Sequence, residues 1–186
     1  MPKKKKLEEP KIQKSPNTVL ELFHSTPIYF KDLTNAKELN QHLLKHIYAW
    51  KKRDEKGIVR SNSLGWHSAV DMHHRKEYHP LVKELFKMQQ EIYQAEGYHP
   101  NTEAVCDNMW ANVNYKYSHN KNHVHPGAQW SGVYYIQAPK ESGRLWFTDP
   151  RGEAHTMVPH WDSKKGRNRN FWREVYYEPV PGRLIL

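Results

Sequence analysis

WANVNYKYSHNKNHVHPGAQWSGVYYI, residues 110–136, is the most informative stretch of the chain. Polar and apolar residues alternate at its start, and His123 and His125 then precede the turn-forming pair Pro126-Gly127. On an extended segment, side chains two residues apart point to the same face. Two imidazoles beside a turn suit a first-row metal ion with open coordination positions. We therefore predict a metal site with His123 and His125 as ligands.

Two helical segments precede a run of short strands. Apolar residues recur at helical spacing from Asn35, which forms a capping-box pattern with Glu38, to a stop at Gly57. A second helix is expected from about His79 to Glu96. This order predicts an α+β fold whose strands close as a jelly roll or barrel. The predicted strands cover residues 20–30, 108–115, 131–136, 143–148, 174–177 and 183–186.

The length of 186 residues suits one domain. We expect residues 1–18 to be a disordered basic tail and residues 19–186 to form a single domain. The N-terminus is charged without a following apolar run, so it is not a secretory signal. No apolar run is long enough to cross a membrane. The single cysteine, Cys106, fits a reducing compartment, and we expect a cytoplasmic protein in which Cys106 is a packed small residue.

The net charge of +9 is concentrated in two segments, residues 1–16 and 163–174. A domain that reads a duplex usually carries its charge on a folded face. The two segments are therefore expected to act mainly in solubility, and a nucleic-acid partner is not expected. A role of residues 164–173 in guiding an acidic substrate is left open, and so is a homodimer.

Several blocks of the chain together resemble one known family. The chain resembles the double-stranded β-helix oxygenases that use Fe(II) and 2-oxoglutarate, and most of all the 2OG-Fe(II) oxygenase family. The resemblance covers nearly everything after Leu20, and the block at 123–136 is the most specific. The blocks are STPIYF (25–30), GWHS (65–68), WANVN (110–114), HVHPGAQWSGVYYI (123–136), SGRLWFTDPR (142–151) and PVPGRLIL (179–186).

The resemblance implies roles for particular residues. His123 corresponds to the first iron ligand, and His125 takes the place of a carboxylate ligand in prolyl-hydroxylase-like relatives. Tyr135 falls where a tyrosine contacts the distal carboxylate of 2-oxoglutarate. Asn114 and Tyr115 are predicted to orient ligands or cosubstrate. No catalytic residue beyond the metal ligands is predicted, and the implied reaction hydroxylates an unknown substrate while 2-oxoglutarate is converted to succinate.

The family pattern also implies groups outside the chain. Its distal histidine and the arginine that pairs with 2-oxoglutarate lie beyond the strand that follows PGRLIL. We therefore expect the sequence to be incomplete at its C-terminus, with the last strands missing and the full iron centre not assembled. His155 and His160 are weaker candidates for the third ligand, because a flexible loop positions ligands poorly.

Two readings from other classes stay open. His-x-His near a strand end suits a cupin-like protein that binds a metal or small molecule without oxygenase activity equally well. A basic nucleic-acid-binding module is the third reading, and it predicts an affinity that depends on residues 1–16. His42 and His46, four residues apart on the first helix, are expected to form a solvated flank instead of a metal site.

Overall fold

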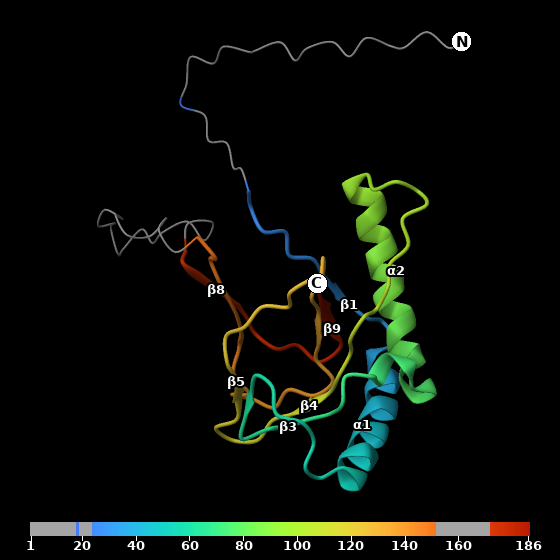
Figure 1. The fold of residues 1–186 in the computed structure, drawn as a ribbon, viewed down its shortest axis with the longest axis vertical. Helices are drawn as coiled ribbons and strands as arrows, with labels where there is room; N and C mark the ends of the chain where they lie inside the picture. Colours follow the sequence, from blue (N-terminus) through green and yellow to red (C-terminus); the bar gives the residue numbers. More distant parts are fainter. Residues whose placement is uncertain (1–17, 19–23, 152–171) are drawn as a thin grey trace.

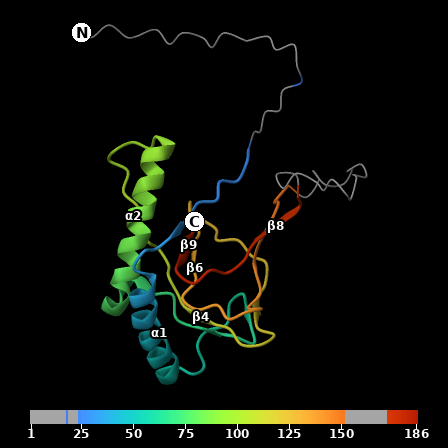
Figure 2. The same ribbon diagram turned by 180° about the vertical axis from the view of Figure 1, so that it is seen from behind.

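The computed structural model describes Thr18, residues 24–151 and residues 172–186. Two helices lie on one side of a group of short strands, as the front and back views both show (Figures 1 and 2). The helices are α1 (Ala36–Arg53) and α2 (His79–Glu96), with short 3-10 turns at Met72–His74 and Lys76–Tyr78 before α2. The described strands are β1 (Phe30–Asp32), β2 (Asn62–Ser63), β3 (Trp66–His67), β4 (Asn112–Val113), β5 (His119–Asn120), β6 (Val133–Tyr134), β7 (Leu145–Thr148), β8 (Glu174–Tyr177) and β9 (Arg183–Ile185).

Helix α1 begins where the sequence predicted, but without the expected capping box. Asn35 is the N-cap residue, and its side chain makes no capping hydrogen bond. Its φ of −95° and ψ of 17° are not the extended geometry that brings a cap side chain to the free N–H groups. The helix also ends at Arg53, before the predicted stop at Gly57. The predicted apolar stripe is confirmed, because Leu39, Leu43, Ile47 and Trp50 are all buried.

Helix α2 follows its sequence pattern closely. Pro80 lies in the first turn, where its missing N–H costs nothing. Gly97 ends the helix in the left-handed conformation, with φ of 74°. Met88 and Ile92 are buried, and they form a core cluster with Leu184 and Leu186 at the other end of the described chain. The helix therefore anchors the C-terminal strand.

The described strands form several small antiparallel sheets. Sheet pairing joins β1, β9 and β6 in that order, and the remaining pairs are β2 with β5, β3 with β4, and β7 with β8. The molecule is thus a mixed α/β fold with two helices and small antiparallel sheets. The pairings among these described strands do not by themselves define a closed jelly roll. Two of these pairs join segments that are far apart in the sequence. Residues 62–63 pair with residues 119–120, and residues 66–67 pair with residues 112–113.

The first strand is shorter and later than the sequence predicted. Residues 24–29 are not a strand, β1 covers only Phe30–Asp32, and residues 20–23 lie outside the described part. Pro27 explains the shift, because proline lacks the N–H that a sheet ladder needs. Among the described strands β1 pairs with β9 alone, so it lies at an edge of its sheet. The backbone exchange between Tyr29 and Leu186 extends this pairing by one residue.

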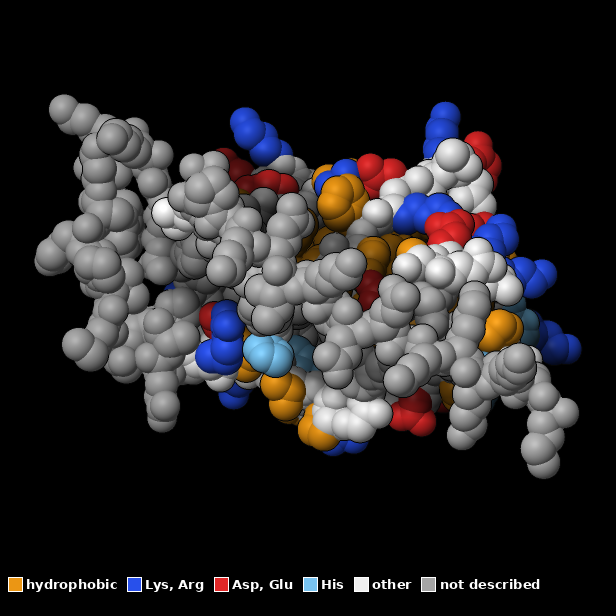
Figure 3. Space-filling view, turned by 90° about the horizontal axis from the view of Figure 1, so that it is seen from above, with side chains coloured by type: hydrophobic (Ala, Val, Ile, Leu, Met, Phe, Trp, Pro, Cys, Tyr) orange, Lys and Arg blue, Asp and Glu red, His pale blue; other side chains and the backbone are white. Residues whose placement is uncertain are grey.

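Strand β9 occupies the centre of its sheet. It pairs with β1 on one side and β6 on the other, and Leu184, Ile185 and Leu186 are buried. These apolar residues therefore do not form an exposed edge of this sheet. Whether further strands follow stays a prediction. Seen from above, the molecule shows basic and acidic side chains close together (Figure 3). Neither described helix is long and apolar enough to cross a membrane.

Candidate metal centre

His123 and His125 lie in the connection between β5 and β6. Strand β5 ends at Asn120, so the two histidines lie close to a strand end but in neither strand. Pro126 and Gly127 form the expected turn directly after them, and Gly127 adopts the left-handed conformation with φ of 82°. The backbone N–H of Ala128 donates to the carbonyl of His125 and closes this turn. The pair is therefore presented by a loop that β5 holds at one end.

The two imidazoles converge on one point. Nε2 of His123 lies 3.1 Å from Nε2 of His125, and the ring planes are inclined by 45°. Two imidazole nitrogens that bind one cation at about 2.1 Å, at roughly a right angle, are separated by about 3.0 Å. The observed separation fits two neighbouring positions around one metal ion. The two rings can therefore supply two ligands to an iron ion.

Each ring is also held by its second nitrogen. Nδ1–H of His123 donates to the carbonyl of Lys121 at 2.7 Å, which leaves the lone pair on Nε2. Nδ1 of His125 lies 2.8 Å from the hydroxyl of Ser131. Because this hydroxyl can donate or accept, His125 can carry its proton on either nitrogen. With the lone pair of His123 on Nε2, Nε2–H of His125 donates to it. To bind a cation through Nε2, His125 would instead carry its proton on Nδ1, facing Ser131.

The pKa of His125 is lowered, first by burial and then by the neighbouring His123. A lowered pKa keeps the imidazole neutral near pH 7, and only the neutral ring can bind a metal ion. The local environment therefore favours the protonation state that a ligand requires.

A row of rings continues from the histidine pair toward the interior of the protein. The ring of Trp110 lies edge-on to His125 with centroids 5.3 Å apart, and stacks on His67 at 5.4 Å with the planes inclined by 13°. His67 is buried and donates from Nδ1 to the carbonyl of Ser68. Burial lowers the pKa of His67, the hydrogen bond to Ser68 opposes that effect, and Arg60 lowers the pKa further. This row forms an inner wall behind the metal position.

A third protein ligand is not present among the described residues. No group of three or more His, Cys, Asp or Glu side chains gathers in the part of the chain that the structure describes. His155 and His160, the weaker candidates, lie outside the described residues. The donor set therefore fits iron at two positions.

The three residues predicted to contact the cosubstrate are connected less directly to the histidine pair. Asn114 is exposed and its amide donates to Asn120 at 3.4 Å. Tyr115 is exposed, and the ammonium group of Lys51 lies 5.7 Å from its ring centroid. Tyr135 is half-buried, and burial raises its pKa. None of the described hydrogen bonds of these three residues reaches the histidine pair, and their roles stay predictions.

The sequence-based predictions did not include every residue that the structure places near the two histidines. Ser131 was missed, although a serine that opens the strand after a Pro-Gly turn is a usable signal for a hydrogen-bond partner of the preceding loop. Trp66 is buried and donates from Nε1 to the carbonyl of Asp54, so its role is packing, whereas His67 reaches the inner wall.

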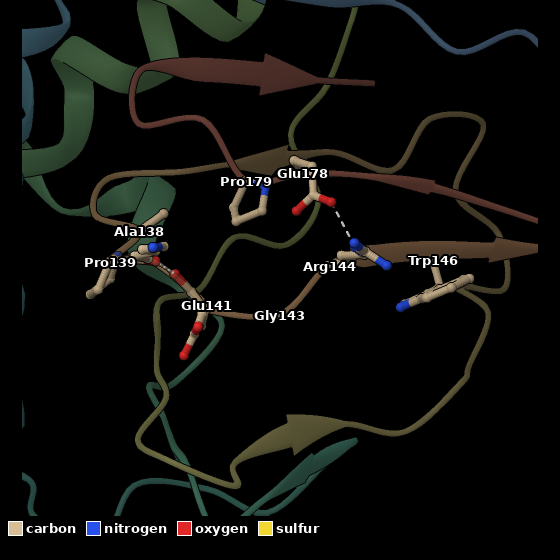
Figure 4. Close-up of a pocket in the computed structure, with 10 residues that line it drawn as sticks. Ala138, Pro139, Glu141, Gly143, Arg144, Trp146, Glu178 and Pro179 are labelled. Atoms are coloured by element: carbon tan, nitrogen blue, oxygen red, sulfur yellow. Dashed lines mark hydrogen bonds and ion pairs between the residues drawn. The ribbon is translucent and has the colours of Figure 1, made fainter.

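A pocket of about 590 Å³ lies away from these residues, between the 138–146 segment and Glu178-Pro179. Figure 4 shows the ion pair between Arg144 and Glu178 at its edge, with Trp146 beside it. Nε of Arg144 lies 2.6 Å from the Glu178 carboxylate. No predicted ligand or cosubstrate residue lines this pocket, so we do not assign it to the metal centre.

Comparison with known proteins finds one similar family. Residues 108–186 match the family model described as "Putative 2OG-Fe(II) oxygenase". The matched part of the chain contains His123, His125 and the strands β4 to β9, and it is similar to that family. No curated protein and no solved structure matches the chain.

Proposed function

We propose that the protein is an Fe(II)- and 2-oxoglutarate-dependent dioxygenase that hydroxylates a substrate not yet identified, on strands arranged as a double-stranded β-helix. One observation carries the proposal, the convergence of the two Nε2 atoms at 3.1 Å. The family match over residues 108–186 supports the same reaction class. We also propose Tyr135, Asn114 and Tyr115 as the residues that contact the cosubstrate.

The residues of the chain have distinct tasks in this proposal. His123 and His125 hold the iron ion, and Lys121 and Ser131 orient their rings through Nδ1. Bound iron would supply, with 2-oxoglutarate and O₂, the oxidising power that hydroxylates a C–H bond, while 2-oxoglutarate loses CO₂ and becomes succinate. Trp110 covers the inner side of His125 and excludes water from that side.

The test combines turnover with metal binding. The 186-residue protein is incubated with Fe(II), O₂ and 2-oxoglutarate, and succinate is measured. Binding of Fe(II) is followed separately by calorimetry without O₂. His123→Ala and His125→Ala are expected to lose both signals, because each removes one of the two convergent nitrogens. The matched control is His119→Ala, an exposed histidine in the preceding strand β5 whose Nδ1 lies 3.5 Å from the carbonyl of Tyr117. Unchanged metal binding in both site variants would overturn the proposal.

A cupin-like metal binder without oxygenase activity is the second candidate. The observation that favours it is that the described residues supply two metal ligands and no third. The same experiment separates the two functions. Metal binding that depends on His123 and His125, with no binding of 2-oxoglutarate and no succinate, would favour the binder.

A further inference from the structure

Two segments that are far apart in the sequence meet through hydrogen bonds. Residues 51–64 run from the last turn of α1 through β2, and residues 115–121 run through β5. The hydroxyl of Ser118 donates to the carbonyl of Leu64 at 2.8 Å, and the N–H of Lys121 donates to the carbonyl of Ser61 at 2.9 Å. We call the exposed side chains of these two segments the basic aromatic surface.

The two segments that form this surface carry an excess of positive charge. Residues 51–64 carry five cationic and two acidic side chains, and residues 115–121 carry two cationic and no acidic ones. One of the acids, Asp54, accepts a hydrogen bond from the N–H of Gly57 within its own loop. In the sequence, the positive charge of residues 1–16 and 163–174 is larger. The charge of the two segments adds up only because folding brings them together. The surface therefore attracts a polyanion.

Large apolar side chains stand among these charges. Tyr115, Tyr117 and Leu64 are 56%, 77% and 76% exposed. The ammonium group of Lys51 lies 5.7 Å from the centroid of the Tyr115 ring, and that of Lys116 lies 5.1 Å from the Tyr117 ring. A flat exposed ring beside a cation is suited to stack on a base while the cation pairs with the phosphate backbone.

Two of these side chains are held in an unfavourable backbone conformation. Leu64 has φ of 59° and Tyr117 has φ of 69°, a region that bulky residues rarely adopt. Glycine or asparagine would occupy either position with less strain. Exposed apolar residues in strained turns contribute little to folding, and such strain is typical of functional sites.

We propose that the basic aromatic surface binds single-stranded nucleic acid. An acidic peptide would satisfy the charges, but it offers no flat group for the two exposed tyrosine rings. The end of this surface is near the histidine pair in the sequence, since the carbonyl of Lys121 accepts a hydrogen bond from the His123 ring. The proposal does not depend on oxygenase activity.

Binding is measured by fluorescence anisotropy with labelled 12-nucleotide oligouridylate and oligothymidylate, on the full chain with EDTA present. Tyr117→Asn is expected to weaken binding about five-fold or more, because it removes a stacking ring. It should not lower the melting temperature, since asparagine tolerates the left-handed conformation. Tyr117→Phe is the matched control, and its affinity should stay within about two-fold because it keeps the ring.

A second variant tests the charge. Lys116→Gln should reduce the slope of log affinity against log salt by about 0.7, the value for one phosphate contact with a single strand. Lys83→Gln, an exposed lysine on α2, should leave the slope unchanged. Any contribution of the Lys-rich first 16 residues is common to all variants, so it cancels in these comparisons.

The proposal fails if the oligonucleotides do not bind, or if Tyr117→Asn binds them as the unmodified chain does. It also fails if a 12-residue polyglutamate peptide binds as tightly as the oligonucleotides, because the surface would then recognise negative charge alone. None of these outcomes bears on iron binding, which is measured on separate samples.

Discussion

Ser131 places its hydroxyl 2.8 Å from Nδ1 of His125 and so restrains the direction of the second imidazole. The partner of His123, by contrast, is the backbone carbonyl of Lys121, which no side-chain change removes. The two rings are thus oriented by different kinds of group. Such partners of metal-binding histidines affect affinity without touching the metal.

Replacing Ser131 with alanine is expected to weaken Fe(II) binding by about ten-fold or more, because His125 loses the acceptor of its Nδ1 proton. Ser131 is exposed, so the melting temperature should not change. Calorimetry without O₂ measures the affinity. The control is Ser142→Ala, whose hydroxyl bonds the carbonyl of Pro139 in another loop. Equal affinity in the two variants would show that Ser131 does not hold the ring.

At the scale of elements, the loop after α1 packs against β3, the strand that carries His67 of the inner wall. Gly57 has φ of 57°, and its backbone lies so close to β3 that an added Cβ would be 2.5 Å from the carbonyl of His67. The N–H of Ile58 donates to that same carbonyl. The close approach therefore requires glycine at position 57.

Gly57→Ala is expected to destabilise the fold by at least about 1 kcal/mol more than Gly97→Ala. Both glycines have positive φ, but a Cβ at Gly97 meets nothing within 4 Å. The comparison thus separates steric contact from backbone strain. Urea unfolding of the two variants measures the difference, and equal losses would contradict the close approach of Gly57 to His67.

Strands β1 and β9 are linked by a two-pronged ion pair. Nε and Nη2 of Arg183 donate to the two carboxylate oxygens of Asp32, both at 2.7 Å. These hydrogen bonds hold the pKa of Asp32 below its ordinary value of 3.8. A lowered pKa contributes stability that is present above the unfolded pKa and is lost as the pH falls through the folded pKa.

Asp32→Asn is therefore expected to cost at most about 1 kcal/mol at pH 7, because the pair is largely exposed to solvent. The difference from the unmodified protein should shrink as the pH falls below 3.8. Urea unfolding across this pH range gives the measurement. Glu103→Gln, an exposed change, should leave stability at pH 7 unaltered. A difference that grows toward low pH would have the wrong sign and would refute the assignment.

For the whole molecule, the C-terminal strand connects the parts that the sequence separates most widely. Strand β9 lies between β1, near the start of the described chain, and β6, directly after the metal loop. Leu184 and Leu186 also pack on α2 through Met88 and Ile92. Stability of the fold therefore depends on a few buried residues at its end.

Ile185→Ala is expected to cost about 2–5 kcal/mol, because Ile185 is 2% exposed and the change leaves a cavity in the central strand. Thermal unfolding followed by circular dichroism measures the loss. Val105→Ala removes methyl groups from a side chain that is 81% exposed, and it should change stability by no more than about 0.5 kcal/mol. Similar losses in both variants would contradict the central position of β9.

Local patterns along the chain were sufficient for several predictions. The apolar spacing from Leu39 to Trp50 predicted α1, and Pro80 with Gly97 delimited α2, because helices satisfy their hydrogen bonds within the segment and bury one stripe. The runs at 143–148 and 174–177 were predicted as strands, and they pair as β7 and β8. The spacing of His123 and His125 predicted that their rings would face the same way, as they do.

Tertiary contacts decided the rest. The pairing of residues 62–67 with residues 112–120 depends on which backbone edges remain free when the chain is compact, and no short window of sequence contains that information. The same holds for the contact of Ser131 with His125 and for the meeting of Lys51 with Tyr115. By itself, the amino-acid sequence determined the helices and the paired imidazoles, because these depend on neighbours a few residues away. Only folding determined the sheet order, the hydrogen bond of Ser131 to the His125 ring and the basic aromatic surface, because these arise from contacts that no short stretch of sequence specifies.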